Sequence, residues 1–294
     1  MKRTDFVIPM VFDDDPEWRS DFMRLKRVYH DKAYYTACWR SWGTEHLLVK
    51  AIRKFMPWVR TIHILLARES QIRDWMREED VHIVLHKDFI PEEYLPTFSS
   101  NTIEMFLHKI PGLSEYFIYG NDDVYPLSPL KEEQFFNDEK PCQIYVERDF
   151  PEDNNIFYKF VKNGLDMIAA DFGKEYNGKW LYGGHSLSPF LKSTCEKVWE
   201  LHGDRILASL TPERSPGNFN QYIYAFYQHF SKNYCFDIPP RLLLTALLPP
   251  EKIARVISKS DVGVVCINDY ERVEDFPSYR KVVYEALKNK ILNN

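Results

Sequence analysis

The sequence predicts an α/β fold, with a mainly parallel, Rossmann-like sheet in its first half and a largely helical second half packed on it. Short apolar runs alternate with segments of helical spacing through residues 1–126, as in repeated strand-helix-strand units. The runs are apolar at nearly every position, which is typical of strands that helices cover on both faces. Helical spacing then dominates residues 127–294, and no repeat or flexible linker separates the halves. We therefore expect one compact domain over residues 1–294.

The expected strands are short and apolar, and most of them lie in the first half. They cover residues 5–12, 59–66, 81–85, 116–119, 143–146 and 262–266. The expected helices carry apolar residues three and four positions apart, and Ser99 or Ser100 is expected to cap one that runs through Leu107. The others cover residues 18–28, 44–55, 71–76, 157–168, 190–201, 218–230 and 279–292.

Composition and cysteine usage exclude several classes of protein. The net charge is −5 with both signs interspersed, so the overall field does not attract nucleic acid or an anionic membrane. The apolar run 6–12 contains Pro9 and leads into three aspartates, unlike a signal peptide, and no segment has the apolar length of a membrane span. The cysteines are odd in number and without a Cys-x-x-Cys pair, so we expect free thiols in a reducing compartment. They are Cys38, Cys142, Cys195, Cys235 and Cys266. A cytoplasmic protein is expected, with peripheral contact to a membrane complex left open.

Asn121, Asp122 and Asp123 directly follow the expected strand 116–119. In open α/β sheets, ligands bind beyond the carboxyl ends of the strands, and carboxylate oxygens suit Mg²⁺ or Mn²⁺ with a phosphorylated substrate. A polar turn would explain the same three residues. A second expected strand ends similarly, at Asn268 and Asp269, so the two strand ends are candidates to share one metal.

Three further clusters are candidates for binding or catalysis. Ser99, Ser100 and Asn101 lie at an expected helix start, where free N–H groups favour phosphate, although capping explains part of the pattern. His185 follows two glycines and could transfer a proton near neutral pH, although most histidines have no such role. Arg214 precedes a helix and could hold phosphate through two hydrogen bonds, with a surface ion pair as the alternative.

Longer motifs resemble the second conserved region of the Stealth family. The matching residues occur in the family's order, at 56–60, 95–101, 103–104, 107–115 and 121–124. Other segments are similar to the remaining regions: Asp5 with 15–18 to the first, His185 and 214–221 to the third, and 266–269 with 276–277 to the fourth. Residues 8–13 depart from the first region's usual pattern. The resemblance covers nearly the whole chain.

Stealth proteins are sugar-1-phosphate transferases, which include bacterial capsular polysaccharide phosphotransferases and the animal enzyme that modifies lysosomal glycoproteins. The resemblance implies a glycosyltransferase-A-like fold and an enzyme that transfers a hexose 1-phosphate from a UDP-sugar to a saccharide hydroxyl and releases UMP. It implies a bacterial protein of capsule or surface-polysaccharide synthesis. The alternatives are a metal-dependent glycosyltransferase that releases UDP, and a non-catalytic subunit that binds nucleotide sugars.

The resemblance also implies roles for individual residues. His185 would be the base toward the acceptor hydroxyl, Arg214 would stabilise phosphoryl charge, and Asp5 and Asp123 would be further catalytic residues. The metal, Mg²⁺ or Mn²⁺, would be bound by Asp122, Asp123, Asn268 and Asp269. Substrate would be bound by Ser99, Ser100, Asn101, Asn121, Asn220 and Gln221.

Overall fold

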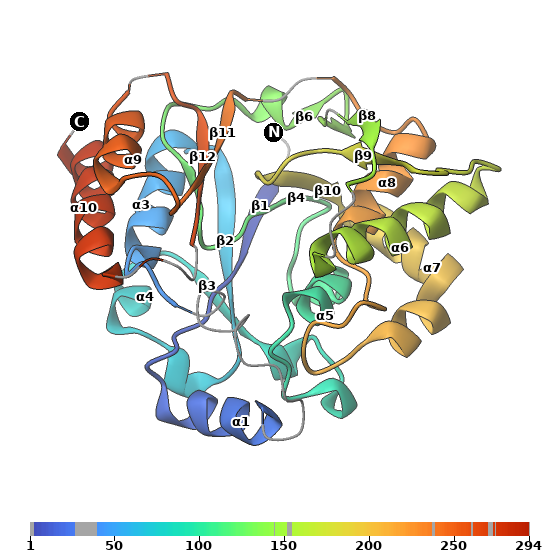
Figure 1. Cartoon of the computed structure of the whole chain (residues 1–294), viewed down its shortest axis with the longest axis horizontal. Helices are drawn as coiled ribbons and strands as arrows, with labels where there is room; N and C mark the ends of the chain where they lie inside the picture. Colours follow the sequence, from blue (N-terminus) through green and yellow to red (C-terminus); the bar gives the residue numbers. More distant parts are fainter. Residues whose placement is uncertain are drawn as a thin grey trace.

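The computed structural model describes residues 3–26, 40–143, 145–151, 155–236, 239–259, 261–269, 273 and 275–293. Its central sheet has the strand order β10-β4-β1-β2-β3 (Figure 1). Four strands are parallel, and β10 runs antiparallel beside β4. The strands are β1 (Thr4–Pro9), β2 (Val59–Leu66), β3 (His82–Leu85), β4 (Tyr116–Tyr119) and β10 (Ser188–Leu191). Because the chain extends the sheet from β1 in both directions, a crevice is expected between the ends of β1 and β4.

Each face of the sheet packs on its own hydrophobic core. On β1, Phe6 and Ile8 belong to one core and Val7 belongs to the other, because successive side chains of a strand point to opposite faces. Helices from both halves of the chain cover the two faces (Figure 1). They are α3 (Glu45–Phe55), α9 (Pro250–Ile257) and α10 (Phe276–Lys288) on one face, and α6 (Ile156–Asp171), α7 (Lys192–Ser209) and α8 (Tyr222–Phe230) on the other.

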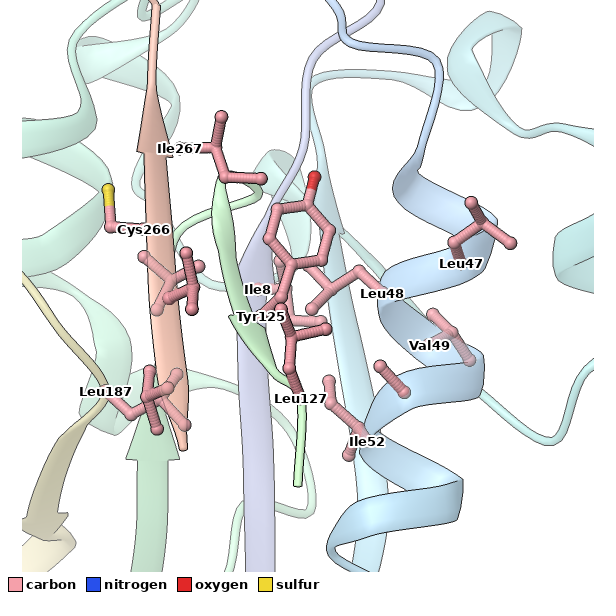
Figure 2. Packing of buried hydrophobic residues seen from close by; sticks show 14 of the residues in the cluster. Ile8, Leu47, Leu48, Val49, Ile52, Tyr125, Leu127, Leu187, Cys266 and Ile267 are labelled. Carbon is pink, nitrogen blue, oxygen red and sulfur yellow. The ribbon is translucent and has the colours of Figure 1, made fainter. Parts of the chain in front are cut away.

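A smaller sheet holds the segment that follows β4. Its strands are β11 (Arg241–Thr245), β12 (Val264–Asn268) and β5 (Val124–Pro126), in that order. Figure 2 shows Tyr125 from β5 and Leu127 just beyond it packed between β12 and helix α3. Asp122 and Asp123 connect β4 to β5, so each end of this short link is anchored in a different sheet. The Ile267 N–H of β12 also donates to the Asp123 carbonyl at 2.8 Å.

The remaining elements are short and connect the two sheets and their helices. The helices are α1 (Pro16–Lys26), α4 (Asp74–Glu78), α5 (Ser100–Met105) and a final π-helical turn, η6 (Asn289–Asn293). The 3₁₀ turns are η1 (Glu69–Gln71), η2 (His86–Asp88), η3 (Glu92–Tyr94), η4 (Leu107–Lys109) and η5 (Glu132–Gln134). Two two-stranded sheets pair β6 (Phe136–Asn137) with β7 (Lys140–Pro141), and β8 (Val146–Asp149) with β9 (Lys179–Tyr182). Among the helices of the described ranges, none combines the length and the apolar character needed to cross a membrane.

The predicted fold class is confirmed, and β2 and β4 have the bounds predicted from sequence. The second half contains more strand than predicted, because β9, β10 and β11 were not expected. The helix predicted to begin at residue 190 begins at Lys192, since Phe190 and Leu191 pair with β4 in the sheet. Other predicted bounds were also wrong: the first strand ends at Pro9, and the helix predicted from residue 218 begins at Tyr222. Positions 27, 28 and 144 of the predicted elements lie outside the described residues.

The expectation of five free thiols was wrong for one pair. Cys142 and Cys235 form a disulfide, with their Cα atoms 4.5 Å apart. A separation of 93 residues hides this pairing from the sequence, because only the fold brings β7 beside the chain that follows α8. Cys195 and Cys266 are buried free thiols, and Cys38 lies outside the described residues. The disulfide removes the cysteine-based argument for a reducing compartment.

Candidate active site

A cavity of about 250 Å³ opens where the four parallel strands end. Each of these strands contributes the residues that follow its last position. Met10 and Val11 follow β1, Ala67 follows β2, His86 follows β3, and residues 121–123 follow β4. The cavity therefore lies at the crevice that the sheet topology predicts for a ligand.

The most polar part of the cavity surrounds His185, in the loop between β9 and β10. Its Nε2 lies 3.3 Å from the Asn121 amide nitrogen and 3.6 Å from Asp123 Oδ1. Burial by itself would lower the pKa of His185, but the adjacent Asp123 carboxylate outweighs burial and raises that pKa. A proton accepted by this imidazole is thus stabilised by the adjacent carboxylate.

Two further carboxylates lie close to Asp123 and concentrate negative charge. Asp122 lines the cavity, and burial followed by the charges of Asp123 and Glu45 raises its pKa well above the usual value. Glu45, the first residue of α3, lines the cavity as well, and burial raises its pKa. Such a cluster attracts a cation that compensates the repulsion between the carboxylates.

Arg214 also lines the cavity, from the loop between α7 and α8. Its Nη2 donates to Ser100 Oγ at 2.8 Å. The same loop is attached to α5 through Glu104, whose carboxylate accepts the Gln221 N–H at 2.8 Å and the Tyr119 hydroxyl at 3.0 Å. Glu104 is buried, and burial raises its pKa. Helix α5 therefore positions the Arg214 guanidinium directly through Ser100, and positions the loop that carries it through Glu104.

The structure brings together most of the residues predicted from sequence. Those that line the cavity are Ser100, Asn121, Asp122, Asp123, His185, Arg214, Asn268 and Asp269. Four predicted substrate-binding residues are buried and do not line it: Ser99, Asn101, Asn220 and Gln221. They belong to the start of α5 and the loop before α8, which hold Ser100 and Arg214, and their direct contact with substrate stays a prediction.

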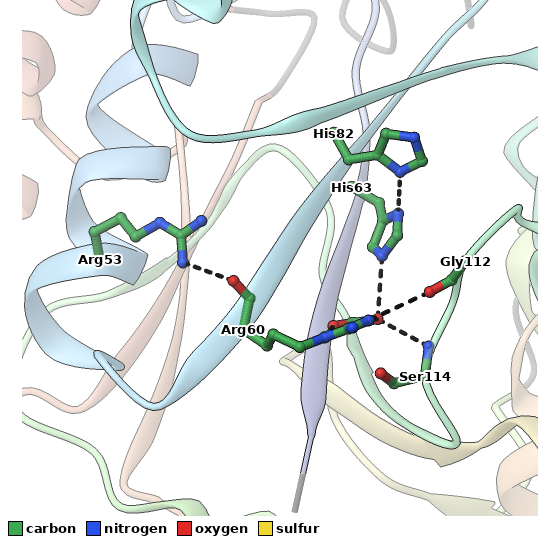
Figure 3. A network of polar contacts seen from close by, with 7 residues as sticks. Arg53, Arg60, His63, His82, Gly112 and Ser114 are labelled. Atoms are coloured by element: carbon green, nitrogen blue, oxygen red, sulfur yellow. Dashed lines mark hydrogen bonds and ion pairs between the residues drawn. The ribbon is translucent and has the colours of Figure 1, made fainter.

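Asp5 is separated from this cavity. It lies in β1 four residues before Pro9, or about 13 Å at the rise of a strand, and it is fully buried. Its carboxylate accepts two hydrogen bonds from Arg60, at 2.9 and 2.8 Å, and one from the Ser114 N–H at 2.8 Å. Figure 3 shows Arg60, Ser114 and His63, which surround it. His63 Nε2 completes the group at 3.2 Å. These contacts give Asp5 a structural role, and the active-site role that the resemblance implies stays a prediction.

Asp269 lines the cavity but is paired with a cation of the protein. Arg40 donates to both of its carboxylate oxygens at 2.7 Å, and the same guanidinium lies 3.7 Å from the centre of the Phe276 ring. Arg40 thus neutralises Asp269 in this structure, and the role of Asp269 as a metal ligand stays a prediction. Asn268 is exposed at the cavity margin, where its amide oxygen is available to a ligand.

Three residues of the site were not selected from sequence. Glu104 is part of the motif that resembles the second Stealth region, so that motif contained a usable indication. Glu45 begins an expected helix, where acidic residues are common for reasons of the helix dipole. His86 follows β3, and nothing in its neighbourhood distinguishes it from other histidines at a strand end.

Among the described residues, the side chains close enough together to share a metal ion are those of Asp123, His185 and Cys266. Asp123 Oδ1 is buried and has no hydrogen-bond partner among the described residues, and the Asp122 carboxylate and Asn121 amide are its sequence neighbours. Cys266 Sγ lies within metal-binding distance of Asp123 and His185, but burial and then the Asp123 charge raise its thiol pKa well above the usual value. The protonated thiol donates to Asp123 Oδ2 at 3.3 Å. Oxygen ligands favour Mg²⁺ or Mn²⁺ over zinc.

A cavity at parallel strand ends with clustered carboxylates, a histidine and an arginine defines a class of enzyme that acts on phosphorylated substrates. Residues 39–144 match the model for conserved region 2 of Stealth proteins. The chain is 32% identical to the capsular polysaccharide phosphotransferase fcs1 of Haemophilus influenzae, over 70% of this chain and 59% of that protein. It is 28% identical to the receptor polysaccharide phosphotransferase WefC of Streptococcus gordonii, over 94% of this chain and 92% of that protein.

The chain belongs to the Stealth family, and the phosphotransferase class predicted from sequence is confirmed. Among solved structures, it is similar to the galactosyltransferase LgtC over 96% of this chain and 95% of that chain, at 9% identity and a TM-score of 0.40.

Proposed function

We propose that this protein transfers a hexose 1-phosphate from a UDP-sugar to a hydroxyl of a saccharide acceptor, in the synthesis of a capsular or other surface polysaccharide. The observation that carries the proposal is the convergence of His185, Asp123 and Arg214 on one cavity in a member of this family. The acceptor oxygen bonds to the sugar-linked phosphorus, and the bond from that phosphorus to the UMP oxygen breaks. UMP leaves with that oxygen, and a phosphodiester remains.

His185 is placed to accept the proton of the attacking hydroxyl. A general base needs a pKa near the operating pH and a group that stabilises its charged form. Asp123, 3.6 Å from His185 Nε2, supplies that stabilisation and raises the pKa of the imidazole. The Asn121 amide at 3.3 Å restricts the orientation of the ring.

Arg214 is placed to stabilise the charge of the phosphoryl oxygens. Its hydrogen bond to Ser100 holds the guanidinium at the cavity before substrate binds, and a charge that is already oriented costs little reorganisation during reaction. Mg²⁺ or Mn²⁺ bound by Asp122 and Asp123 would neutralise part of the diphosphate charge. The protein groups then have to align the acceptor with the phosphorus that it attacks.

The identity of the released nucleotide tests the reaction. The protein is incubated with a panel of UDP-sugars, capsule-type oligosaccharide acceptors and Mg²⁺ or Mn²⁺, and nucleotides are separated by ion-exchange chromatography. UMP, together with an acceptor heavier by one hexose phosphate, is the expected result. UDP would instead indicate transfer of the sugar alone, and binding of UDP-sugar without any turnover would indicate a binding subunit.

Two variants test the residue roles. His185→Ala and Arg214→Ala are each expected to lower kcat/KM by about 10² to 10⁴, the usual loss for a base or a charge-stabilising donor. The matched controls outside the cavity are His202→Gln, whose buried ring pairs with Asp171 of α6, and Arg205→Ala at an exposed position of α7. Circular dichroism checks folding, and near wild-type turnover of either active-site variant would refute its role.

A further inference from the structure

The end of the cavity farthest from Asn121 has a different character from the polar end. Its walls are apolar and aromatic, from Met10, Val11, Trp18, Ala67 and Phe98. Trp18 and Phe98 meet edge to face with ring centres 5.4 Å apart. A pyrimidine has apolar faces and a polar edge, which suits such a surface.

His86 is a buried polar side chain at this end, as is Thr97. His86 is 5% exposed and lines the cavity, and its Nε2 has no hydrogen-bond partner among the described residues. Its ring meets Phe89 edge to face at 6.0 Å, which holds the imidazole from the side of the core. Burial lowers the pKa of His86 to about 4, so the ring is neutral at physiological pH and offers one donor and one acceptor.

The sheet sets the distance between His86 and the polar end. His86 follows β3 and Asn121 lies just beyond β4, and β2 and β1 lie between these strands. Three strand spacings amount to about 14 Å. This separation matches the extent of an extended uridine diphosphate from its base to its terminal phosphate. A diphosphate near Arg214 and His185 thus leaves the base to reach the apolar end.

We propose that His86 hydrogen-bonds to the edge of the nucleobase of the donor nucleotide and makes this end of the cavity a base-binding subsite. The inference rests on the proposed function, because it assumes a nucleotide donor. It assigns a recognition role to a residue that the proton transfer and the phosphoryl stabilisation do not use. His86 would act on donor affinity and leave the chemical step to His185 and Arg214.

The test measures binding of UMP and of ribose 5-phosphate, which lacks the base, by isothermal titration calorimetry. His86→Phe keeps a ring of similar size but removes both nitrogens, and it is expected to weaken UMP binding about 5- to 100-fold, as for a buried group left without its partner. Ribose 5-phosphate affinity should stay unchanged. His86→Gln, which keeps a donor and an acceptor, should recover part of the loss. In steady state, the KM for the UDP-sugar should rise while kcat stays within about twofold.

A matched control comes from another buried histidine. His108 is 3% exposed, its Nδ1 also lacks a partner among the described residues, and it packs against Trp199 outside the cavity. His108→Phe should leave UMP affinity unchanged. A second measurement uses wild-type protein and so does not depend on folding of a variant: a methyl group on N3 of the UMP base should weaken binding at least fivefold.

Several results would overturn the inference. These are UMP affinity of His86→Phe within twofold of wild type, equal losses for UMP and ribose 5-phosphate, or undiminished binding of the N3-methylated nucleotide. The outcome is separable from that of the proposed function. Release of UDP by wild-type protein would refute phosphoryl transfer but would not contradict base recognition by His86. Release of UMP, together with unchanged UMP affinity of His86→Phe, would support phosphoryl transfer and refute base recognition by His86.

Discussion

Replacing Asp5 by asparagine separates a structural role from a catalytic one. Asp5 is fully buried and accepts two hydrogen bonds from the Arg60 guanidinium and one from the Ser114 N–H, and His63 Nε2 lies within hydrogen-bond distance. Asparagine keeps the shape but removes the charge and turns one acceptor into a donor that faces other donors. A hydrogen bond to a charged group contributes about 1.5–3 kcal/mol. The Arg60 side chain is 39% exposed, so solvent screening reduces the contribution of its ion pair with Asp5 to stability.

The expected loss in free energy of unfolding is therefore about 2–4 kcal/mol, or roughly 5–10 °C in the midpoint of thermal unfolding. Thermal unfolding followed by circular dichroism measures it. Turnover of the folded protein at 20 °C should stay within about twofold of wild type, because Asp5 lies away from the cavity. Asp80→Asn is the matched control, since that carboxylate is fully exposed and 3.8 Å from Arg53, and it should change stability by less than about 0.5 kcal/mol.

The same variant has a signature in pH. Burial by itself would raise the pKa of Asp5, but hydrogen bonds from His63, Arg60 and Ser114 outweigh burial and hold that pKa well below its usual range. A lowered carboxyl pKa stabilises the fold above pH 4, and this contribution is lost as pH falls below that value. Wild-type stability should thus decline more steeply than that of Asp5→Asn between about pH 5 and 2. A variant as stable as wild type but without turnover would refute this reasoning and restore the catalytic role.

Two other predictions concern stability. Replacing Cys142 and Cys235 by serine should lower the free energy of unfolding by about 2–4 kcal/mol, because their bond closes a long loop. Wild-type protein should lose a similar amount of stability in dithiothreitol. Two additional reactive thiols in untreated wild-type protein would contradict the pairing. Gly263→Ala should lower the free energy of unfolding by more than about 3 kcal/mol. Gly263 has a φ of +70°, and the added Cβ would lie 2.0 Å from the Pro240 carbonyl oxygen. Gly112→Ala, at a φ of +74° with open space around the Cβ, should lower the free energy of unfolding by only about 1 kcal/mol. Equal unfolding midpoints for the two variants would argue against the close contact between Gly263 and Pro240.

Much of the first half was predictable because its determinants are local. The runs that form β2 and β4 are apolar throughout and end at turn or polar residues, so burial on both faces and the strand limits follow from adjacent positions. Asn121, Asp122 and Asp123 were identifiable because they directly follow such a run. His185 and Arg214 were candidates from their own neighbourhoods as well, but only the family motifs linked them to one site with the aspartates.

The sequence by itself determined the alternation of strands and helices, the position of the carboxylates at a strand end and the family. Only the tertiary structure decided the antiparallel addition of β10, the Cys142–Cys235 bond and the partners of Asp5 and Asp269. Each of these depends on groups far apart in the chain, whose pairing is selected by burial and geometry after the sheet has formed. His86 became a candidate for the same reason, since an unpaired buried nitrogen is a property of its surroundings and not of the residues next to it.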